Sequence, residues 1–529
     1  MRGLSLVIAL AVTVGVTTLR PAAHAEQVIG ATGAAVTSDA VAGLRGALDA
    51  LVAHPARAQD AWGVLAVSLT HGDTLYAFNP SLPLAPASNM KLLTTAAALH
   101  YLGPEYRFPT FLLTDGTVSD GVLNGNILLY GTGDPTLGRR FDQQPAPALR
   151  AFADTLIALG IREIRGDVIG DGSYFQGRGS GDGWAATYLP SWYAAPAGAL
   201  SVHENLVRLI VKPGGAPGAR PLVEYVPGGR GIAVVNLATS QGGGRVRVRR
   251  FAFDAPVLIE GGIGTGESVH DVPVGDPARY AAAVFRELLE ERGIVVTGGV
   301  RAISGEGASP VSSRRIHAPA FDSGSPLRLL AVHSSTRLRE ILLVINHESH
   351  NFYADQVLRA VGRVAAGEGS VRGGEEAVRR MLSAIGADTT GIAMKDGCGL
   401  SPLNRVSANT FVTLLAQMAR SGWGAEFRQL LPVAGHAARF RRMGGTPAEG
   451  NLHAKTGTID AVSALSGYVT TADGELVAFS ILSNGVASTA SSKHIENLIG
   501  IRLAEFSRSA ARIDGAAGVP AAAASPPAR

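Results

Sequence analysis

Apolar and polar positions follow three textures along the chain, and each texture predicts a different kind of structure. Two short strand-like runs, 62–68 and 74–79, flank the turn residues 71–73 and predict a β-hairpin. Residues 88–99 then carry apolar side chains at helical spacing, with Ser88 near the start of the predicted helix. The first part of the chain therefore predicts two strands followed by a helix.

Between about 111 and 315 the texture changes to short β-type runs separated by turns rich in Gly, Asp and Pro. The predicted strands lie in the runs 125–131, 166–170, 206–211, 231–237 and 245–253. Helical spacing is clearest over 148–159 and 280–292. This middle part predicts one or two small β-rich domains.

Helical spacing returns after residue 327, and strands follow near the end of the chain. The predicted helices cover 327–345, 351–366, 374–385, 407–420 and 491–506. The predicted strands cover 454–458, 464–470 and 476–483, and an Asp473-Gly474 turn joins the last two. Both ends thus combine strands with helices, which predicts an α+β domain built from the two ends and interrupted by a β-rich insertion.

Composition narrows the class of protein. The 529 residues are 46% hydrophobic and 17% charged, which is typical of a globular chain and excludes a disordered or fibrous one. The net charge of +4 is too small to indicate a nucleic-acid partner. The single cysteine, Cys398, excludes an internal disulfide framework and a multi-cysteine metal site.

The first residues have the pattern of an export signal. Arg2 is followed by the mostly apolar stretch 4–19 and by Ala23-His24-Ala25, which fits the small-x-small cleavage rule. We therefore expect a signal peptide over 1–25 and an exported protein, periplasmic or otherwise extracytoplasmic, with at most peripheral membrane contact. The Ala/Pro/Gly-rich end, 513–529, is expected to be disordered.

Three short motifs carry the candidate chemistry. In chain order they are Ser88-x-x-Lys91, Ser349-His350-Asn351 and Lys455-Thr456-Gly457. Lys91 lies one helical turn after Ser88, so its amine can reach the hydroxyl. A serine hydroxyl needs a nearby base to become a nucleophile. Lysine serves as that base when burial or a second cation, for which Lys455 is the candidate, lowers its pKa. Lysine is also scarce here, with five among 47 basic residues, and only lysine can give up its proton.

The ordered set resembles the D-alanyl-D-alanine carboxypeptidase/endopeptidase family, the class C low-molecular-mass penicillin-binding proteins. Further segments are similar to family motifs: 349–355, Asp396-Gly397-Cys398-Gly399-Leu400-Ser401, and 198–205 in the insertion. The wide gap between Lys91 and Ser349 fits the family's two-domain insertion. The resemblance covers nearly all of 40–508.

The resemblance implies an α+β fold, a penicillin-binding/serine β-lactamase-like transpeptidase domain with an antiparallel sheet flanked by helices. On this basis we expect the split peptidase domain at 26–113 and 327–512. The remaining expected boundaries place an inserted β-rich domain at 114–137 and 222–326 and a second, nested domain at 138–221.

The resemblance also implies the roles of single residues. Ser88 would attack the D-Ala–D-Ala bond of a peptidoglycan stem peptide, with Lys91 taking its proton. Ser349 would relay a proton to the leaving amine, Asn351 would hold the lysine and the substrate amide, and Lys455 would keep the region electropositive. Thr456 would bind the terminal carboxylate, Gly457 would let the substrate backbone approach, and the backbone of Ser88 and Thr458 would form the oxyanion hole. β-Lactams would acylate the same serine. The resemblance implies no cofactor and no metal, and the sequence leaves the oligomeric state open.

Two features leave alternatives open. Cys398 stands where the family has serine, and we expect a buried small residue there rather than a nucleophile. Trp184 and Trp192 are expected to be packing residues. A serine β-lactamase and an inactive wall-binding scaffold remain as competing functions, and carboxypeptidase and endopeptidase action are not separated.

Overall fold

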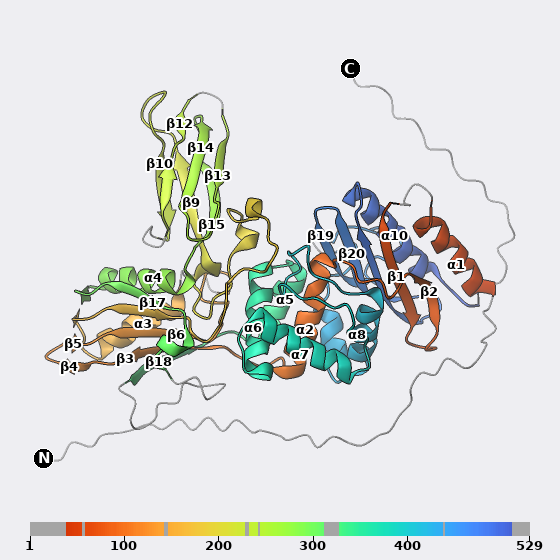
Figure 1. The fold of residues 1–529 in the computed structure, drawn as a ribbon, viewed down its shortest axis with the longest axis horizontal. Coiled ribbons are helices and arrows are strands. Elements are labelled where there is room, and N and C mark those ends of the chain that lie inside the picture. Colours follow the sequence, from red (N-terminus) through yellow and green to blue (C-terminus); the bar gives the residue numbers. More distant parts are fainter. Residues whose placement is uncertain are drawn as a thin grey trace, which may run out of the picture.

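The computed structural model describes residues 39–54, 59–141, 146–227, 232–241, 244–311, 327–436 and 440–509. The expected signal peptide and the expected C-terminal tail lie outside these ranges. Figure 1 shows an elongated molecule, with the segments near both chain ends at one side and the middle of the chain at the other. The first of these parts, residues 39–101 and 338–509, is called the split unit below.

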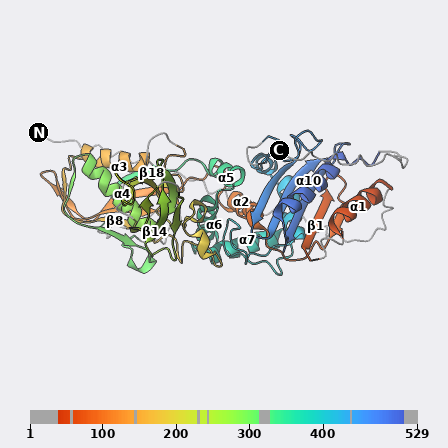
Figure 2. The same ribbon diagram turned by 90° about the horizontal axis from the view of Figure 1, so that it is seen from above.

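The split unit is built on a five-stranded antiparallel sheet. Its strand order is β19-β20-β21-β1-β2. The strands are β1 (Ala61–Ser68), β2 (Thr74–Phe78), β19 (His453–Ile459), β20 (Val462–Thr470) and β21 (Leu476–Asn484). Almost every residue of β20 and β21 is buried, because helices cover both faces of the sheet. Figure 2 shows α1 (Asp39–Val52) and α10 (Thr489–Glu505) beside the sheet, and α8 (Ala408–Arg420) packs against β21 and β1 on the other face.

The middle of the chain forms a separate α/β body, here called the insertion. One sheet has the order β17-β8-β6-β3-β18 and another has the order β16-β7-β5-β4. The strands of the first sheet are β3 (Pro109–Thr114), β6 (Ile127–Gly131), β8 (Val168–Asp171), β17 (Val300–Ile303) and β18 (Arg328–Ser334). Those of the second are β4 (Thr117–Ser119), β5 (Val122–Asn124), β7 (Glu163–Ile164) and β16 (Val295–Val296). Helices α3 (Pro147–Ala158) and α4 (Pro277–Glu291) share a core with these sheets.

A smaller all-β body, the nested unit, projects from the insertion (Figure 1). It spans 206–273 and contains the sheet β10-β9-β15 and a four-stranded sheet of β11 to β14. Its strands are β9 (Leu206–Lys212), β10 (Leu222–Val226), β11 (Val234–Asn236), β12 (Thr239–Ser240), β13 (Val246–Arg249), β14 (Val257–Ile263) and β15 (Ser268–Pro273). Because β15 pairs with β9, the two ends of this unit lie next to each other.

The strand pairing divides the insertion differently from the expected boundaries. The expected nested domain, 138–221, would separate β9 from its partner β15. It would also separate β8 from its partner β6 and α3 from the sheets with which it shares a core. Strand β3 and strand β18, expected at the junction with the peptidase domain, pair with each other inside the insertion. The expected helix over 327–345 is also wrong in its first half, because 328–334 form β18 and only Leu338–His347 form a helix, α5. Sequence spacing could not detect this switch, because pairing with β3 is a long-range contact.

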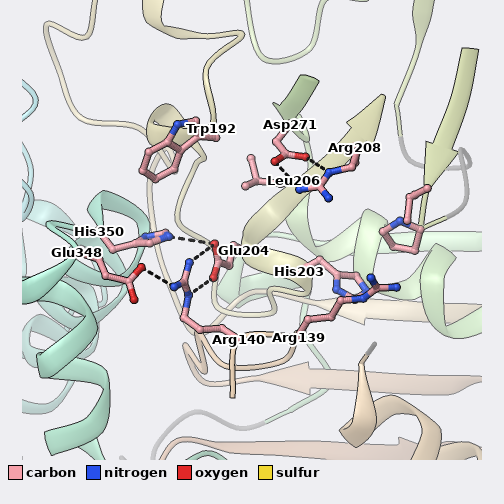
Figure 3. Close-up of a pocket in the computed structure, with 12 residues that line it drawn as sticks. Arg139, Arg140, Trp192, His203, Glu204, Leu206, Arg208, Asp271, Glu348 and His350 are labelled. Atoms are coloured by element: carbon pink, nitrogen blue, oxygen red, sulfur yellow. Dashed lines mark hydrogen bonds and ion pairs between the residues drawn. The ribbon is translucent and has the colours of Figure 1, made fainter. Parts of the chain in front are cut away.

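The insertion and the split unit meet at a network of charged side chains. Glu204, from the insertion, accepts hydrogen bonds from Arg140 Nε at 2.6 Å and from His350 Nε2 at 3.0 Å. Arg140 Nη1 also donates to Glu348 Oε2 at 2.5 Å. Figure 3 shows Glu204 between Arg140 and His350, with Glu348 on the far side of the arginine. The two bodies are therefore joined directly beside the Ser349 motif.

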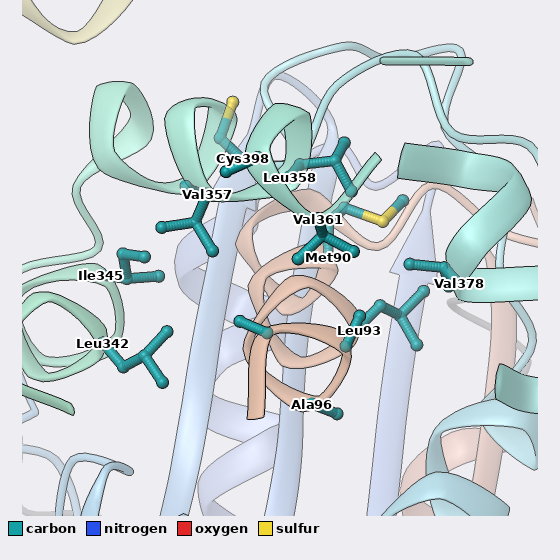
Figure 4. Close-up of a cluster of buried hydrophobic side chains, with 14 of the residues drawn as sticks. Met90, Leu93, Ala96, Leu342, Ile345, Val357, Leu358, Val361, Val378 and Cys398 are labelled. Atoms are coloured by element: carbon teal, nitrogen blue, oxygen red, sulfur yellow. The ribbon is translucent and has the colours of Figure 1, made fainter. Parts of the chain in front are cut away.

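Helix α2 (Met90–Tyr101) lies at the centre of the helical layer. Ten consecutive residues from Met90 to Leu99 are buried, because neighbouring helices surround α2. Those helices include α5, α6 (Asn351–Ala366), α7 (Val371–Ala384) and α8. Figure 4 shows Met90, Leu93 and Ala96 among side chains of these helices, with Cys398 at the edge of the cluster. The start of α2 is thereby fixed on all sides.

No helix in the described ranges is both long enough and apolar enough to span a bilayer.

Candidate active site

Ser88 lies in a short 3₁₀ turn, Ala87–Asn89, that leads into α2. Ala87 has a φ of 44°, in the left-handed region, so the chain turns sharply just before the serine. The turn packs against two glycines: a Cβ on Gly399 would lie 1.8 Å from the Ala87 carbonyl oxygen, and one on Gly457 would lie 3.0 Å from the Ser88 nitrogen. The glycine of the third motif is therefore explained by contact with the chain's own backbone at 86–88.

Lys91 makes three hydrogen bonds at the bottom of the site. Its Nζ donates to Ser88 Oγ at 2.9 Å, to Asn351 Oδ1 at 2.8 Å and to the Cys398 carbonyl oxygen at 2.6 Å. The lysine is 0% exposed. The helical spacing of the first motif thus places an amine directly beside the serine hydroxyl, and the second motif holds that amine in place.

Burial lowers the pKa of Lys91, because removing the ammonium from water disfavours its charged form. The nearby acids Asp355 and Asp396 act in the opposite direction and favour the ammonium. The cation expected to lower the pKa, Lys455, instead contacts Ser349. Burial rather than a second cation therefore moves Lys91 toward the neutral form in which it accepts a proton.

Asp355, Asp396 and Cys398 form a buried cluster behind Lys91, with their side-chain ligand atoms within 4.8 Å of one another. Both oxygens of Asp396 accept hydrogen bonds, among them one from the Gly399 nitrogen at 2.7 Å and one from Trp184 Nε1 at 2.8 Å. Asp355 Oδ1 accepts from the Gly397 nitrogen at 2.6 Å. These bonds fix the loop whose carbonyl holds Lys91, so the cluster has a structural explanation without a metal ion.

Cys398 is fully buried, and burial together with the two acids raises the pKa of its thiol well above the usual value. A thiol in these surroundings stays protonated and inert. Its backbone carbonyl, which accepts from Lys91, is the part of the residue that reaches the site.

Ser349 and Lys455 form the opposite side of the site. Lys455 Nζ donates to Ser349 Oγ at 3.0 Å and to the Thr456 carbonyl oxygen at 2.9 Å, and the lysine is 1% exposed. Ser349 has a φ of 56°, which places its hydroxyl on a strained turn between α5 and α6. Asn351 Nδ2 donates to the Tyr193 carbonyl oxygen at 2.9 Å, so the second motif also holds the insertion against the site.

A cavity of about 300 Å³, here called the reaction pocket, opens onto these groups. It is lined by Ser88, Ser349, Asn351, Gly399, Leu400, Thr458 and Ile459 of the split unit and by Tyr188, Trp192 and Tyr193 of the insertion. Strand β19, which carries Thr458 and Ile459, is the edge strand of its sheet. Of the three strand residues expected to bind substrate, Thr458 is in this lining, whereas Thr456 and Gly457 are not.

The three aromatic residues of the insertion were not predicted as site residues. Trp184 is a packing residue, as expected, because it packs against the main hydrophobic cluster. Its Nε1 atom also donates a hydrogen bond to Asp396. Trp192 is not, because it is 38% exposed and lines the pocket. The dense aromatic run 188–193, directly before the 198–205 segment that resembles the family, is the signal that could have indicated them.

Comparison with known proteins assigns the chain to a family. The model of the D-Ala-D-Ala carboxypeptidase 3 (S13) family matches residues 44–505. The chain belongs to this family. Membership of the S13 family makes the protein a carboxypeptidase and confirms both the family expected from the motifs and the α+β, penicillin-binding-protein-like fold class.

Similar proteins match most of the chain. The D-alanyl-D-alanine carboxypeptidase of Actinomadura sp. (strain R39) is 34% identical over 483 residues, which is 88% of this chain and 85% of the relative. A D-alanyl-D-alanine carboxypeptidase of Haemophilus influenzae is 27% identical and covers 80% of this chain and 86% of its own. The crystal structure of penicillin-binding protein 4 from H. influenzae superposes with a TM-score of 0.73 at 25% identity, over 87% of this chain and 99% of that one.

Proposed function

We propose that the protein is a serine-type D-Ala–D-Ala carboxypeptidase and endopeptidase that cleaves peptidoglycan stem peptides through an acyl-enzyme on Ser88. The observation that carries the proposal is the buried Lys91 amine 2.9 Å from the Ser88 hydroxyl, with its pKa lowered by burial. A base at hydrogen-bond distance from a hydroxyl at the mouth of a cavity is what nucleophilic catalysis needs.

In acylation, the neutral Lys91 amine takes the Ser88 proton while Oγ bonds to the carbonyl carbon of the penultimate D-Ala. The carbon–nitrogen bond breaks as Ser349, supported by the Lys455 ammonium at 3.0 Å, passes its proton to the leaving amine. Ser349 then takes up the proton that Lys91 received from Ser88, so that Lys91 is neutral again before deacylation. Asn351 holds Lys91 and the substrate amide. The negative charge on the carbonyl oxygen is stabilised by the backbone N–H groups of Ser88 and Thr458.

In deacylation, a water molecule attacks the ester carbonyl and gives one proton to Lys91, which returns it to Ser88 Oγ. The product is the shortened peptide with a new carboxylate, and the enzyme is restored. Thr456 helps to bind the terminal carboxylate of the substrate, and Gly457 follows it on the edge strand. None of these steps calls on a metal or an organic cofactor.

Relatives support the substrate and inhibitor classes. The Actinomadura and Haemophilus proteins are D-alanyl-D-alanine carboxypeptidases, and a second Haemophilus penicillin-binding protein 4 structure, 24% identical, is described as a complex with a β-lactam. We infer that β-lactams acylate Ser88, and that the protein works outside the cytoplasm after removal of the signal peptide 1–25.

Mass spectrometry of the intact protein after incubation with benzylpenicillin tests the proposal. The wild type and a Ser119→Ala control, changed at an exposed serine of the insertion, should each gain the mass of one drug molecule. Ser88→Ala should gain none and should release no D-Ala from a D-Ala–D-Ala peptide. Drug recovered hydrolysed without an adduct would instead indicate a β-lactamase, and drug recovered intact would indicate an inactive scaffold.

A further inference from the structure

A second cavity, of about 600 Å³, adjoins the reaction pocket where the nested unit, the insertion and the Ser349 turn meet. Its charged lining includes Arg139, Arg140, Arg208, Glu204, Asp271 and Glu348, and we call it the arginine cavity. Figure 3 shows these side chains converging from separate segments around one opening. The cavity is thus a feature of how the three bodies come together.

Most charges in the arginine cavity compensate one another. Arg140 pairs with Glu204 and with Glu348. Arg208 makes two hydrogen bonds to Asp271, at 2.7 and 2.9 Å. Within the described ranges, no carboxylate lies at ion-pair distance from the remaining cation, Arg139. The lining therefore carries one positive charge that an anion from outside can pair with.

Two further groups mark Arg139 as the recognition point. Figure 3 shows its guanidinium next to the His203 ring, and burial together with the Arg139 charge lowers the pKa of His203 to about 4. His203 is therefore neutral at physiological pH and does not add to the charge. His350 also lines the cavity, and its Nδ1 atom is buried without a hydrogen-bond partner among the described residues. A cation, a neutral ring and an unsatisfied ring nitrogen suit a ligand with a carboxylate and further polar groups.

The arginine cavity continues from the reaction pocket on the side of the proton donor. Trp192 lines both cavities. Glu348 and His350, the two neighbours of Ser349, line the arginine cavity, while Ser349 itself lines the reaction pocket. In the proposed mechanism Ser349 protonates the leaving amine. Whatever remains attached to that amine therefore leaves the reaction pocket beside the 348–350 turn.

We propose that the arginine cavity binds the leaving-side peptide of a cross-linked substrate, and that Arg139 pairs with a free carboxylate on that peptide. This inference rests on the proposed function and assigns a binding site to the leaving side of its cross-linked substrate. A single D-Ala leaving group ends one residue beyond the scissile bond, whereas a second stem peptide continues for several residues and can enter the adjoining cavity. Arg139 would then distinguish cross-linked peptides from single stem peptides without contacting the reacting atoms.

The test compares three substrates on purified full-length protein. They are a diacylated Lys-D-Ala-D-Ala tripeptide, a cross-linked peptide dimer with free carboxylates on its leaving side, and the same dimer with its leaving-side carboxylates amidated. The carboxylate next to the scissile bond, which Thr456 is proposed to bind, stays free in both dimers. For Arg139→Ala we expect kcat/KM to fall about tenfold on the free dimer, the size of one lost charge-assisted hydrogen bond. We expect no change on the tripeptide, on the amidated dimer or in the rate of acylation by benzylpenicillin. Arg139→Lys should recover part of the loss.

The matched control is Arg247→Ala, which removes an exposed arginine from β13 of the nested unit and should leave all three substrates unaffected. An unchanged rate of Arg139→Ala on the free dimer overturns the inference, and so does an equal loss on every substrate. A wild type that reacts with penicillin and the tripeptide but not with the dimer also overturns it, while leaving carboxypeptidase action intact. A wild type that reacts with none of these compounds refutes the proposed function itself.

Discussion

The reaction pocket and the arginine cavity share Trp192 in their linings, yet they differ in the charged groups around them. The basic groups of the first are lysines, Lys91 and Lys455, and those of the second are arginines. The acids differ too: burial raises the pKa of Asp355, behind Lys91, to about 7, whereas bonds from His350 and Arg140 overcome burial and lower that of Glu204 to about 2.

The difference follows from what each region does with a proton. Lysine can lose its proton when it is buried, and arginine keeps its charge in every protein environment. A site that transfers protons therefore needs lysine, and here the neighbouring Asp355 has a raised pKa. A site that joins domains and recognises an anion needs arginine, and here Glu204 has a lowered pKa. Substitutions in and around the two regions test this contrast.

Replacing Lys91 by Arg should have the largest effect. The guanidinium keeps the charge but cannot accept the Ser88 proton, so the rate of acylation by benzylpenicillin should fall by about a thousandfold or more. Lys455→Arg is the companion variant, and because Lys455 is proposed to act as a cation, its rate should fall by only about tenfold. Time-resolved mass spectrometry measures both rates. Similar losses in the two variants would contradict the division of roles between the lysines.

Glu204→Gln should weaken the junction between the insertion and the split unit. The lowered pKa of Glu204 corresponds to about 3 kcal/mol of stability that is present above pH 4.5 and is lost as the pH falls toward 2. We expect the variant to be about 2–3 kcal/mol less stable than the wild type at pH 7, and the difference to narrow below pH 4.5. Urea unfolding at several pH values measures it. Glu163→Gln, which breaks the more exposed pair with Arg165, should have a much smaller effect on stability. A pH-independent difference for Glu204→Gln would argue against the ion pair as the cause.

Asp355→Asn should shift the pH dependence of acylation. The negative charge of Asp355 favours the protonated form of Lys91, so its removal lowers the pKa of Lys91 further. The acid limb of the pH–rate profile should therefore move to lower pH, with a rate at the plateau within a few fold of the wild type. The asparagine oxygen can still accept the Gly397 hydrogen bond. Asp120→Asn, at an exposed turn, should leave the profile in place. A shift to higher pH would show that Asp355 does not act through its charge on Lys91.

Cys398→Ser should have the smallest effect. The thiol is buried and protonated, and the carbonyl that binds Lys91 is retained, so acylation and stability should change by about twofold and 1 kcal/mol at most. Complete loss of acylation in this variant would assign the thiol a chemical role that its surroundings do not support.

The sequence predicted the parts of this protein that depend on local spacing. Ser88 and Lys91 are one helical turn apart, and the three ordered motifs identified the family from their residues alone. The order and approximate positions of the main helices were also readable, because the helices of the split unit have clear apolar periodicity.

The remaining features depend on contacts between distant segments. Strand 328–334 was taken for helix because its partner lies more than 200 positions earlier, and the ends of the nested unit were misplaced because β9 and β15 define it only by pairing. Trp192 and the arginine cavity arise where three bodies meet, so no single segment carries their signal. Burial was correctly predicted as a cause of the lowered pKa of Lys91. The opposing effect of Asp355 and Asp396 was not predicted, because these acids come close to Lys91 only in the folded chain.

The order of strands in the split unit also sets when the enzyme can become reactive during its synthesis. Ala85 lies just before the serine turn, and both its backbone N–H and its carbonyl oxygen form hydrogen bonds with the Asn484 side chain, 399 positions later. Lys91 bonds to groups 260 and 307 positions later in the chain. A growing chain that has already produced Ser88 therefore lacks both the base environment and the frame of the site until nearly the last helix is made. The arrangement of the site is thus a property of the finished chain.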